Sequence, residues 1–161
     1  MILGDLAILE EMEAGNIKID PFIPELLNGT SYNFRLDKYF IKLHTTYLYS
    51  HMDRNDSGVT RSVVSEIIIP AKERILASTI EKIGSLSPEI TTQMHARSST
   101  GRKGIEVCGC AGFGDPGYAS HWTLEIFNKN EYPIKLKEGM ILGQISFERV
   151  EGCTKMYKSK Y

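Results

Sequence analysis

One stretch of the chain gathers groups that bind anions. Residues 97–104 (Arg-Ser-Ser-Thr-Gly-Arg-Lys-Gly) contain three cationic side chains, three hydroxyl side chains and two glycines. If Ser98 or Ser99 caps a short helix, free backbone N–H groups and the positive end of the helix dipole point at one spot where phosphate oxygens can bind. The alternative is an exposed loop whose charges are simply solvated. The stretch lacks the Walker A pattern and is therefore not a P-loop.

A second candidate for chemistry is the carboxyl group of Glu125. In a strand over residues 122–127, Glu125 shares a face with Thr123 and Phe127, because side chains alternate with a period of two. These two neighbours predict partial burial of Glu125, and a partly buried carboxyl group suits general acid/base catalysis. A glutamate that faces solvent is the alternative, since this residue type is seldom buried.

The cysteines and histidines do not form a metal-binding pattern. The zinc signatures H-x-E and P-C-x-x-C are both absent. Cys108 and Cys110 are expected on the same side of a strand, but no histidine has a ligand spacing towards them. We therefore expect no metal site and interpret the two cysteines as small buried hydrophobic residues.

Composition limits the class of protein. A length of 161 residues with 42% hydrophobic content predicts a single domain over 1–161. The net charge of -1 gives no basic excess for nucleic acid or an acidic membrane, so a small-molecule partner is favoured. An odd number of cysteines without an apolar leader predicts a reduced, cytoplasmic protein. No window approaches the roughly 18 apolar residues of a membrane span.

The secondary structure that must position these residues is mostly β. One helix is expected over 5–14, with Leu6, Leu9 and Met12 on its apolar face and Gly15 as its cap. Short runs rich in β-branched and aromatic residues follow; they are 32–36, 39–41, 66–69, 74–77 and 122–127. Turn signals separate them; they are 28–29, 84–85, 115–117 and 137–139. Many short strands predict a sandwich, jelly roll or barrel, with 51–61 as an exposed loop.

Four segments taken together resemble the dCTP deaminase family in order and spacing. They are residues 97–104, 111–118, 123–125 and 139–144. The resemblance extends to 31–36 and to the C-terminal 157–161, so it covers nearly the whole chain. It implies a mainly β fold, a distorted β-barrel or jelly roll of the dUTPase-like type, and a homotrimer with shared active sites.

The resemblance also implies roles for matching positions. Glu125 matches the catalytic glutamate, while Ser98, Arg102 and the backbone carbonyl of Ala111 would hold the attacking water. Asp115 resembles the residue that meets the deoxyribose 3′-hydroxyl. Residues 153–161 would form a C-terminal lid. The positions implied as nucleotide contacts are Arg97, Ser98, Ser99, Thr100, Gly101, Arg102, Asp115, Tyr118, Thr123, Leu124, Glu125, Gln144, Tyr157 and Lys160.

The implied activity is zinc-independent hydrolytic deamination of a cytosine deoxynucleotide, dCTP to dUTP, which supplies dUMP for thymidylate synthesis. One carboxyl group that accepts and returns protons can serve the steps. Magnesium is implied only as counter-ion of the triphosphate. Gln144 and the 111–113 stretch resemble bifunctional members that release dUMP. A dUTPase, a dCMP-specific deaminase and a catalytically silent nucleotide-binding regulator stay open. The chain departs from the family pattern at Asn33, Gly114 and Ser120, which stand where aspartate, an apolar residue and glycine are usual.

Overall fold

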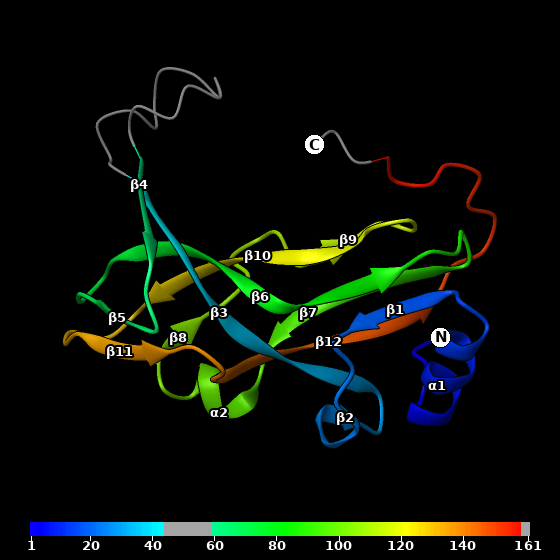
Figure 1. The fold of residues 1–161 in the computed structure, drawn as a ribbon, viewed down its shortest axis with the longest axis horizontal. Helices are drawn as coiled ribbons and strands as arrows, with labels where there is room; N and C mark the ends of the chain where they lie inside the picture. The colour runs from blue at the N-terminus through cyan, green and yellow to red at the C-terminus, as the bar shows by residue number, and fades with distance from the viewer. Residues whose placement is uncertain (44–58, 159–161) are drawn as a thin grey trace.

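The computed structural model describes residues 1–43 and 59–158, which form β-sheets with one N-terminal helix (Figure 1). The helices are α1 (Asp5–Glu13), the 3-10 helix η1 (Pro24–Leu26) and α2 (Ser98–Gly101). The strands are β1 (Ile17–Asp20), β2 (Leu27–Asn28), β3 (Ser31–Leu43), β4 (Val59–Val63), β5 (Glu66–Ile69), β6 (Arg74–Ser85), β7 (Ile90–Ala96), β8 (Ile105–Glu106), β9 (Phe113–Gly114), β10 (Ala119–Asn128), β11 (Ile134–Lys137) and β12 (Ile141–Arg149). The prediction of a mainly β chain with a short N-terminal helix is confirmed.

The main sheet is curled, and its strand order explains why. Over the described residues it follows the order β8-β10-β6-β3-β12-β7-β9, with β1 on β6, and β2 and β4 on β3. β9 ends this order and β10 lies near the opposite end, yet only residues 115–118 connect them along the chain. So short a connection requires the two ends of the sheet to approach each other, which gives the distorted barrel (Figure 1). β11 and β5 form a separate two-stranded sheet.

The core lies on the concave side of this sheet. Alternate residues of β3, Tyr32, Phe34 and Leu36, are fully buried, as the period of two requires. Leu124 and Ile126 of β10 belong to the same core cluster and are equally buried. The predicted runs 32–36 and 39–41 belong to one long strand, β3. The single domain over 1–161 includes residues outside the described ranges and stays a prediction.

The predicted apolar face of α1 is right for Met12, which packs against the core, but wrong for Leu6 and Leu9. Ile8 is its fully buried residue, whereas Leu6 and Leu9 are 72% and 40% exposed. Polar contacts of α1 explain this orientation of the helix. The Glu11 carboxylate accepts a hydrogen bond from Asn16 Nδ2 at 2.7 Å and pairs with Arg149, and these contacts turn Leu6 and Leu9 outwards. The predicted cap is confirmed, because Gly15 follows the helix with φ of +77°.

Two other local predictions need correction. The segment 84–85 is not a turn: β6 runs through both residues, because Gly84 lets the backbone carbonyl of Tyr118 approach within a distance that excludes any side chain. Of the predicted loop 51–61, residues 59–61 belong to β4, where pairing with β3 satisfies their backbone, and the rest lies outside the described residues. No described helix is long and apolar enough to cross a bilayer.

Candidate active site

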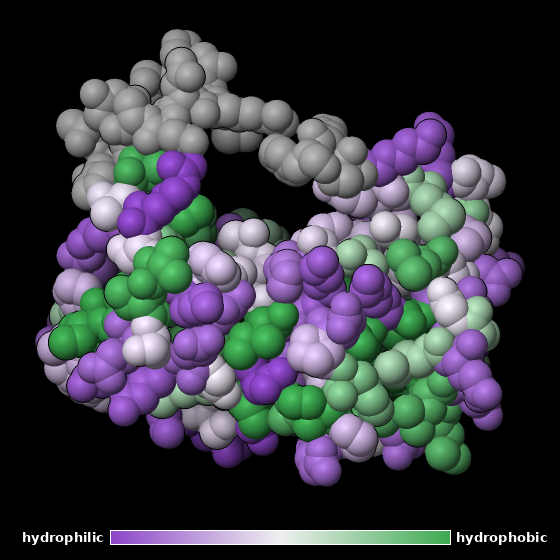
Figure 2. Space-filling model, viewed as in Figure 1, coloured by the Kyte–Doolittle hydropathy of each residue, from purple (hydrophilic) through white to green (hydrophobic). Residues whose placement is uncertain are grey.

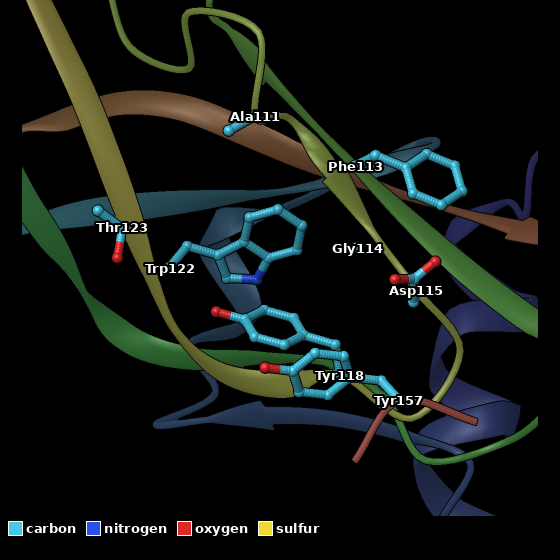
Figure 3. A pocket seen from close by; sticks show the side chains of 8 residues that line it. All are labelled: Ala111, Phe113, Gly114, Asp115, Tyr118, Trp122, Thr123 and Tyr157. Carbon is cyan, nitrogen blue, oxygen red and sulfur yellow. The ribbon is translucent and has the colours of Figure 1, made fainter. Parts of the chain in front are cut away.

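A pocket of about 210 Å³ opens where β9 turns into β10 (Figure 3). It is lined by Ala111, Phe113, Gly114, Asp115, Tyr118, Trp122, Thr123 and Tyr157. The turn that shapes it is closed by the N–H of Tyr118, which donates to the Asp115 carbonyl at 2.9 Å. Gly117 has φ of +92°, a conformation that glycine adopts without strain. The predicted turn at 115–117 is confirmed, and it leaves the Asp115 side chain exposed at the pocket edge.

Three aromatic rings form one wall of this pocket (Figure 3). Tyr118 meets Trp122 edge-on at 5.1 Å between centroids and Tyr157 in the same manner at 5.4 Å. Burial raises the pKa of the Tyr118 phenol, and neighbouring Tyr157 raises it further. The N–H of Tyr157 donates to the Pro116 carbonyl at 2.7 Å, so the C-terminal segment is attached to the turn. Residues 153–158 of the expected lid are thus placed, whereas Lys160 lies outside the described residues.

The packing of Trp122 against Gly114 in the pocket explains why glycine stands at position 114, a departure from the family pattern. A Cβ atom at position 114 would lie 2.6 Å from Cη2 of Trp122 and 2.3 Å from Oγ1 of Thr92. The indole is itself fixed, because its Nε1–H donates to the Ile83 carbonyl at 2.9 Å. Gly114 is therefore required where an apolar side chain is usual. The sequence did not single out Trp122, the only tryptophan of the chain, as a pocket residue.

Glu125 lies two residues beyond Thr123, the last pocket residue of β10, and on the same face of that strand. It is partly buried, as the alternation predicts, and Thr123 is exposed. The backbone N–H of Glu125 donates to the Val107 carbonyl at 3.0 Å, and its backbone forms an isolated parallel β-bridge with Cys108. Its carboxylate rests on Gly109: a Cβ atom there would lie 2.1 Å from Glu125 Oε2. Sequence reasoning missed Gly109, because nothing local indicates that residues 107–109 meet β10.

The segment around Gly109 also corrects the prediction for the cysteines. Residues 108–111 form a turn, closed by the N–H of Ala111, which donates to the Cys108 carbonyl at 2.8 Å. Gly109 has φ of +45°, which ends the extended conformation. Cys110 is consequently exposed and Cys108 is partly buried, so they are not small buried residues of a strand. Both thiols are free.

A second group of expected site residues lies at the junction of β7, α2 and β12. α2 exists, but Arg97 occupies its N-cap position, so the expectation that Ser98 or Ser99 caps it is wrong. The reason is that the Arg97 N–H donates to the Leu142 carbonyl at 3.2 Å and keeps Arg97 extended beside β12. Ser98, Ser99, Gly101 and Arg102 are exposed, whereas Thr100 is buried.

Gln144 belongs to this second group. The neighbouring residue Gly143 pairs with Ala96, the residue before Arg97. Oε1 of Gln144 accepts a hydrogen bond from the Ser31 hydroxyl at 3.0 Å. Leu124, expected to contact the base, is fully buried in the core. Only its backbone can therefore reach a ligand.

The two groups are separated within one chain. Lys129, the residue after β10, lies four residues from Glu125, and its N–H donates to the Gly104 carbonyl. Since a strand rises about 3.3 Å per residue, Gly104 lies roughly 13 Å from Glu125, and α2 precedes it. None of the contacts described for residues 1–43 and 59–158 joins segment 97–102 to Glu125. The expected site residues therefore form two groups, one at the pocket and one at α2, and each is a half-site if the residues of both act together.

Comparison with known proteins decides the family. The model of the dCTP deaminase-like family matches residues 2–150. The chain belongs to this family. A Thermobifida fusca protein named "dCTP deaminase, dUMP-forming" is 38% identical over 151 residues, which cover 90% of this chain and 76% of the relative. A Streptomyces griseus protein of the same name is 35% identical over 173 residues, which cover 100% of this chain and 90% of the relative. The predicted family is confirmed.

Solved structures confirm the predicted dUTPase-like fold. A 2'-deoxycytidine 5'-triphosphate deaminase from Agrobacterium tumefaciens superposes with a TM-score of 0.71 at 20% identity, covering 92% of this chain and 48% of the other. This chain thus spans about half the length of that dCTP deaminase. A Staphylococcus bacteriophage 80alpha dUTPase, solved with dUpNHpp, superposes with a TM-score of 0.55 at 9% identity over 90% of this chain and 88% of the other. At such identities the likeness concerns the fold alone.

Proposed function

We propose that this chain is a dCTP deaminase of the dUMP-forming kind, which replaces the 4-amino group of cytosine by oxygen and then splits the triphosphate. The observation that carries the proposal is the position of Glu125, held against Gly109 beside a pocket whose other walls are aromatic and hydroxyl groups. The name shared by the Thermobifida fusca and Streptomyces griseus relatives supports the same activity.

Glu125 serves the deamination as its single acid/base group. Its carboxylate takes a proton from the attacking water as the oxygen bonds to C4, and gives that proton to the ring N3. A second proton, from the hydroxyl now on C4, returns through Glu125 to the amino group, and the C4–N bond breaks to release ammonia. Ser98, Arg102 and the backbone carbonyl of Ala111, an exposed residue, orient the water.

The pocket accommodates the sugar and the base. The Asp115 carboxylate accepts a hydrogen bond from the deoxyribose 3′-hydroxyl, and the Tyr118 ring lies beside the sugar. Thr123 is exposed on the same strand face as Glu125, which supports a contact between its hydroxyl and the base edge. Tyr157 lies across the opening as part of the lid, with Lys160 as a further contact.

The phosphates require the other half-site, and we propose that a neighbouring copy supplies it. Arg97, Ser98 and Arg102, with Ser99, Thr100, Gly101 and Gln144, would face the triphosphate. Since this group lies too far from Glu125 within one chain, a complete site needs a subunit boundary, and a homotrimer with shared sites provides three. The apolar surface over α1, where Leu6 and Leu9 are exposed, is consistent with association (Figure 2).

Magnesium enters this proposal with the nucleotide. Over residues 1–43 and 59–158 no three His, Cys, Asp or Glu side chains are arranged to hold a metal ion. Mg²⁺ keeps several waters and commonly binds through substrate phosphates, so it would accompany the triphosphate as counter-ion. A second water then attacks the α-phosphorus and pyrophosphate leaves, which yields dUMP. A cytoplasmic location stays a prediction.

The products test the proposal. We expect incubation with dCTP and Mg²⁺ to give ammonia, dUMP and pyrophosphate in equal amounts, measured by chromatography and coupled assays, with dCMP left intact. Glu125→Gln keeps the size of the side chain but cannot shuttle protons, so ammonia release should fall by about 10²–10⁴-fold while calorimetry still detects nucleotide binding.

Each contrary outcome identifies a different error. dUTP as the sole product would remove the second step and leave a monofunctional deaminase. Turnover of dUTP without any ammonia from dCTP would indicate a dUTPase, and deamination of dCMP alone a monophosphate enzyme. Binding without turnover of any nucleotide would indicate a silent regulator. If Glu125→Gln keeps wild-type turnover, the role assigned to Glu125 is wrong.

A further inference from the structure

Two free thiols flank the glycine on which the proposed catalytic carboxylate rests. Cys108 and Cys110 stand on either side of Gly109, in the turn closed by the Ala111 N–H at 2.8 Å from the Cys108 carbonyl. Glu125 meets this turn in two ways: its backbone forms a β-bridge with Cys108, and its Oε2 occupies the space that a Cβ atom at position 109 would need. Any change in the shape of the turn therefore reaches Glu125 directly.

The turn also brings the Cα atoms of the two cysteines into the range that a disulfide requires. Residues two apart have Cα atoms at most about 7 Å apart. The reversal at Gly109, with φ of +45°, brings them closer still. Disulfides need Cα atoms roughly 4.4–6.8 Å apart, so a small rearrangement of the turn suffices to join the sulfur atoms.

The two cysteines differ in a way that fits a two-step exchange. Cys110 is exposed, whereas Cys108 is partly buried beside the carboxylates of Glu106 and Glu125. Burial raises the pKa of the Cys108 thiol, and the two carboxylates raise it further. Cys110 is therefore the thiol that a reagent from solution meets first, and Cys108 the one that reacts next, inside the turn.

We propose that Cys108 and Cys110 form a modification site for low-molecular-weight disulfides, and that their oxidation to an intramolecular disulfide switches off the site at Glu125. The regulatory half of this inference rests on the proposed function, because it takes Glu125 as the catalytic group. The modification itself does not depend on any activity of the chain.

With oxidised glutathione, the exchange takes two steps. The Cys110 thiolate attacks one glutathione sulfur; the glutathione S–S bond breaks, and one glutathione leaves as a thiolate and is protonated. Cys108 then loses its proton and attacks Cys110 Sγ, which releases the second glutathione. Two electrons pass from the cysteine pair to the glutathione disulfide. A bond within so small a ring is strained, and strained disulfides are readily reduced, so the modification is reversible.

Intact mass and peptide mapping test the modification without reference to activity. Reduced protein is incubated with oxidised glutathione and Mg²⁺, and we expect a species lighter by two hydrogen atoms with the link mapped to Cys108 and Cys110. Cys110→Ser should not form it. Cys153→Ser is the matched control, because Cys153 lies in the C-terminal segment and its thiol donates to the Lys155 carbonyl; this variant should oxidise as the wild type does. A stable glutathione adduct, or a link that includes Cys153, would overturn the proposal.

Ammonia release from dCTP, compared before and after oxidation of the same sample, tests the regulatory half. A displacement of about 1 Å costs up to roughly 100-fold in rate, so we expect a loss of about tenfold or more, reversed by dithiothreitol and absent in Cys110→Ser. A mapped disulfide with unchanged turnover would refute the regulation. If the reduced wild type releases no ammonia at all, the proposed function fails instead, and the mass measurement still decides whether the dithiol site exists.

Discussion

Replacing Gly109 with alanine separates a catalytic from a purely structural role for Glu125. A Cβ atom at position 109 would lie 2.1 Å from Glu125 Oε2, and contacts of Cβ atoms below 3.0 Å essentially never occur. The carboxylate oxygen must therefore move by at least about 0.9 Å, the difference between these two distances. Glu125 itself stays in place on β10, with its chemistry unchanged.

The expected effects on rate and stability differ in size. A misplacement of about 1 Å lowers the rate by roughly 100-fold, which is about 2.7 kcal/mol of activation free energy. The clash is with the end of a flexible side chain, which can rotate away, so it costs the fold little. Stability falls mainly because alanine at φ of +45° is disfavoured, by roughly 1–2 kcal/mol. Gly109→Ala should therefore be folded and poorly active.

The measurements are kcat and KM from ammonia release with dCTP, and the free energy of unfolding from urea titration. We expect kcat to carry nearly the whole loss, because the pocket formed by Asp115, Tyr118 and Trp122 is untouched. Gly29→Ala is the matched control: its Cβ atom would meet nothing within 4 Å, and its activity should equal that of the wild type. A folded Gly109→Ala enzyme with kcat within about threefold of the wild type would refute the positioning of Glu125 by this glycine.

The remaining predictions concern the assembly and acid stability. Arg102→Ala and Glu125→Gln should each lose most of the turnover, but mixing and reassembling the two variants in equal amounts should restore about one quarter of the sites, because a shared site needs Arg102 and Glu125 from different chains; no recovery in mixed trimers confirmed by native mass spectrometry would contradict this. Glu11→Gln should lower the free energy of unfolding by roughly 1 kcal/mol at pH 7. The hydrogen bond from Asn16, with the charge of Arg149, holds the pKa of Glu11 below its usual value of 4.5. The stabilisation is therefore complete above that value and is lost as pH falls through the lower folded pKa, so urea titrations of variant and wild type should converge in acid.

Alternation along strands was sufficient to predict the face on which Glu125 lies. Helical spacing was not sufficient to predict the buried face of α1, because the orientation of a short helix depends on the residues that it packs against. The apolar spacing favoured Leu6 and Leu9, but the contacts of Glu11 with Asn16 and Arg149 select the face that carries Ile8. Arg149 is far away in the sequence, so no local pattern contains this information.

The support of Glu125 was unpredictable for the same reason. Its partners, Val107 to Gly109, reach β10 only because β8 pairs with the end of that strand. Read locally, Cys108-Gly109-Cys110 is compatible with an ordinary strand, which led to the wrong expectation of buried cysteines. Trp122 was assigned to the apolar face of its strand, which is correct because the residue is buried. Its ring nevertheless reaches the pocket, because Gly114 leaves the space.

The division of the site follows from the topology of the sheet. α2 continues from β7, which pairs with β12, whereas Glu125 lies on β10, which pairs with β6 and β8. β7 also pairs with β9, whose residues line the pocket, yet none of the contacts of the described residues joins α2 to Glu125. If activity requires both half-sites, it requires association, and the specific activity must fall on dilution below the dissociation constant of the assembly. The fold has its own core, formed by residues such as Phe34, Leu124 and Phe147, and need not be lost at the same concentration. Catalysis is then a property of the assembly, whereas the fold is a property of the chain.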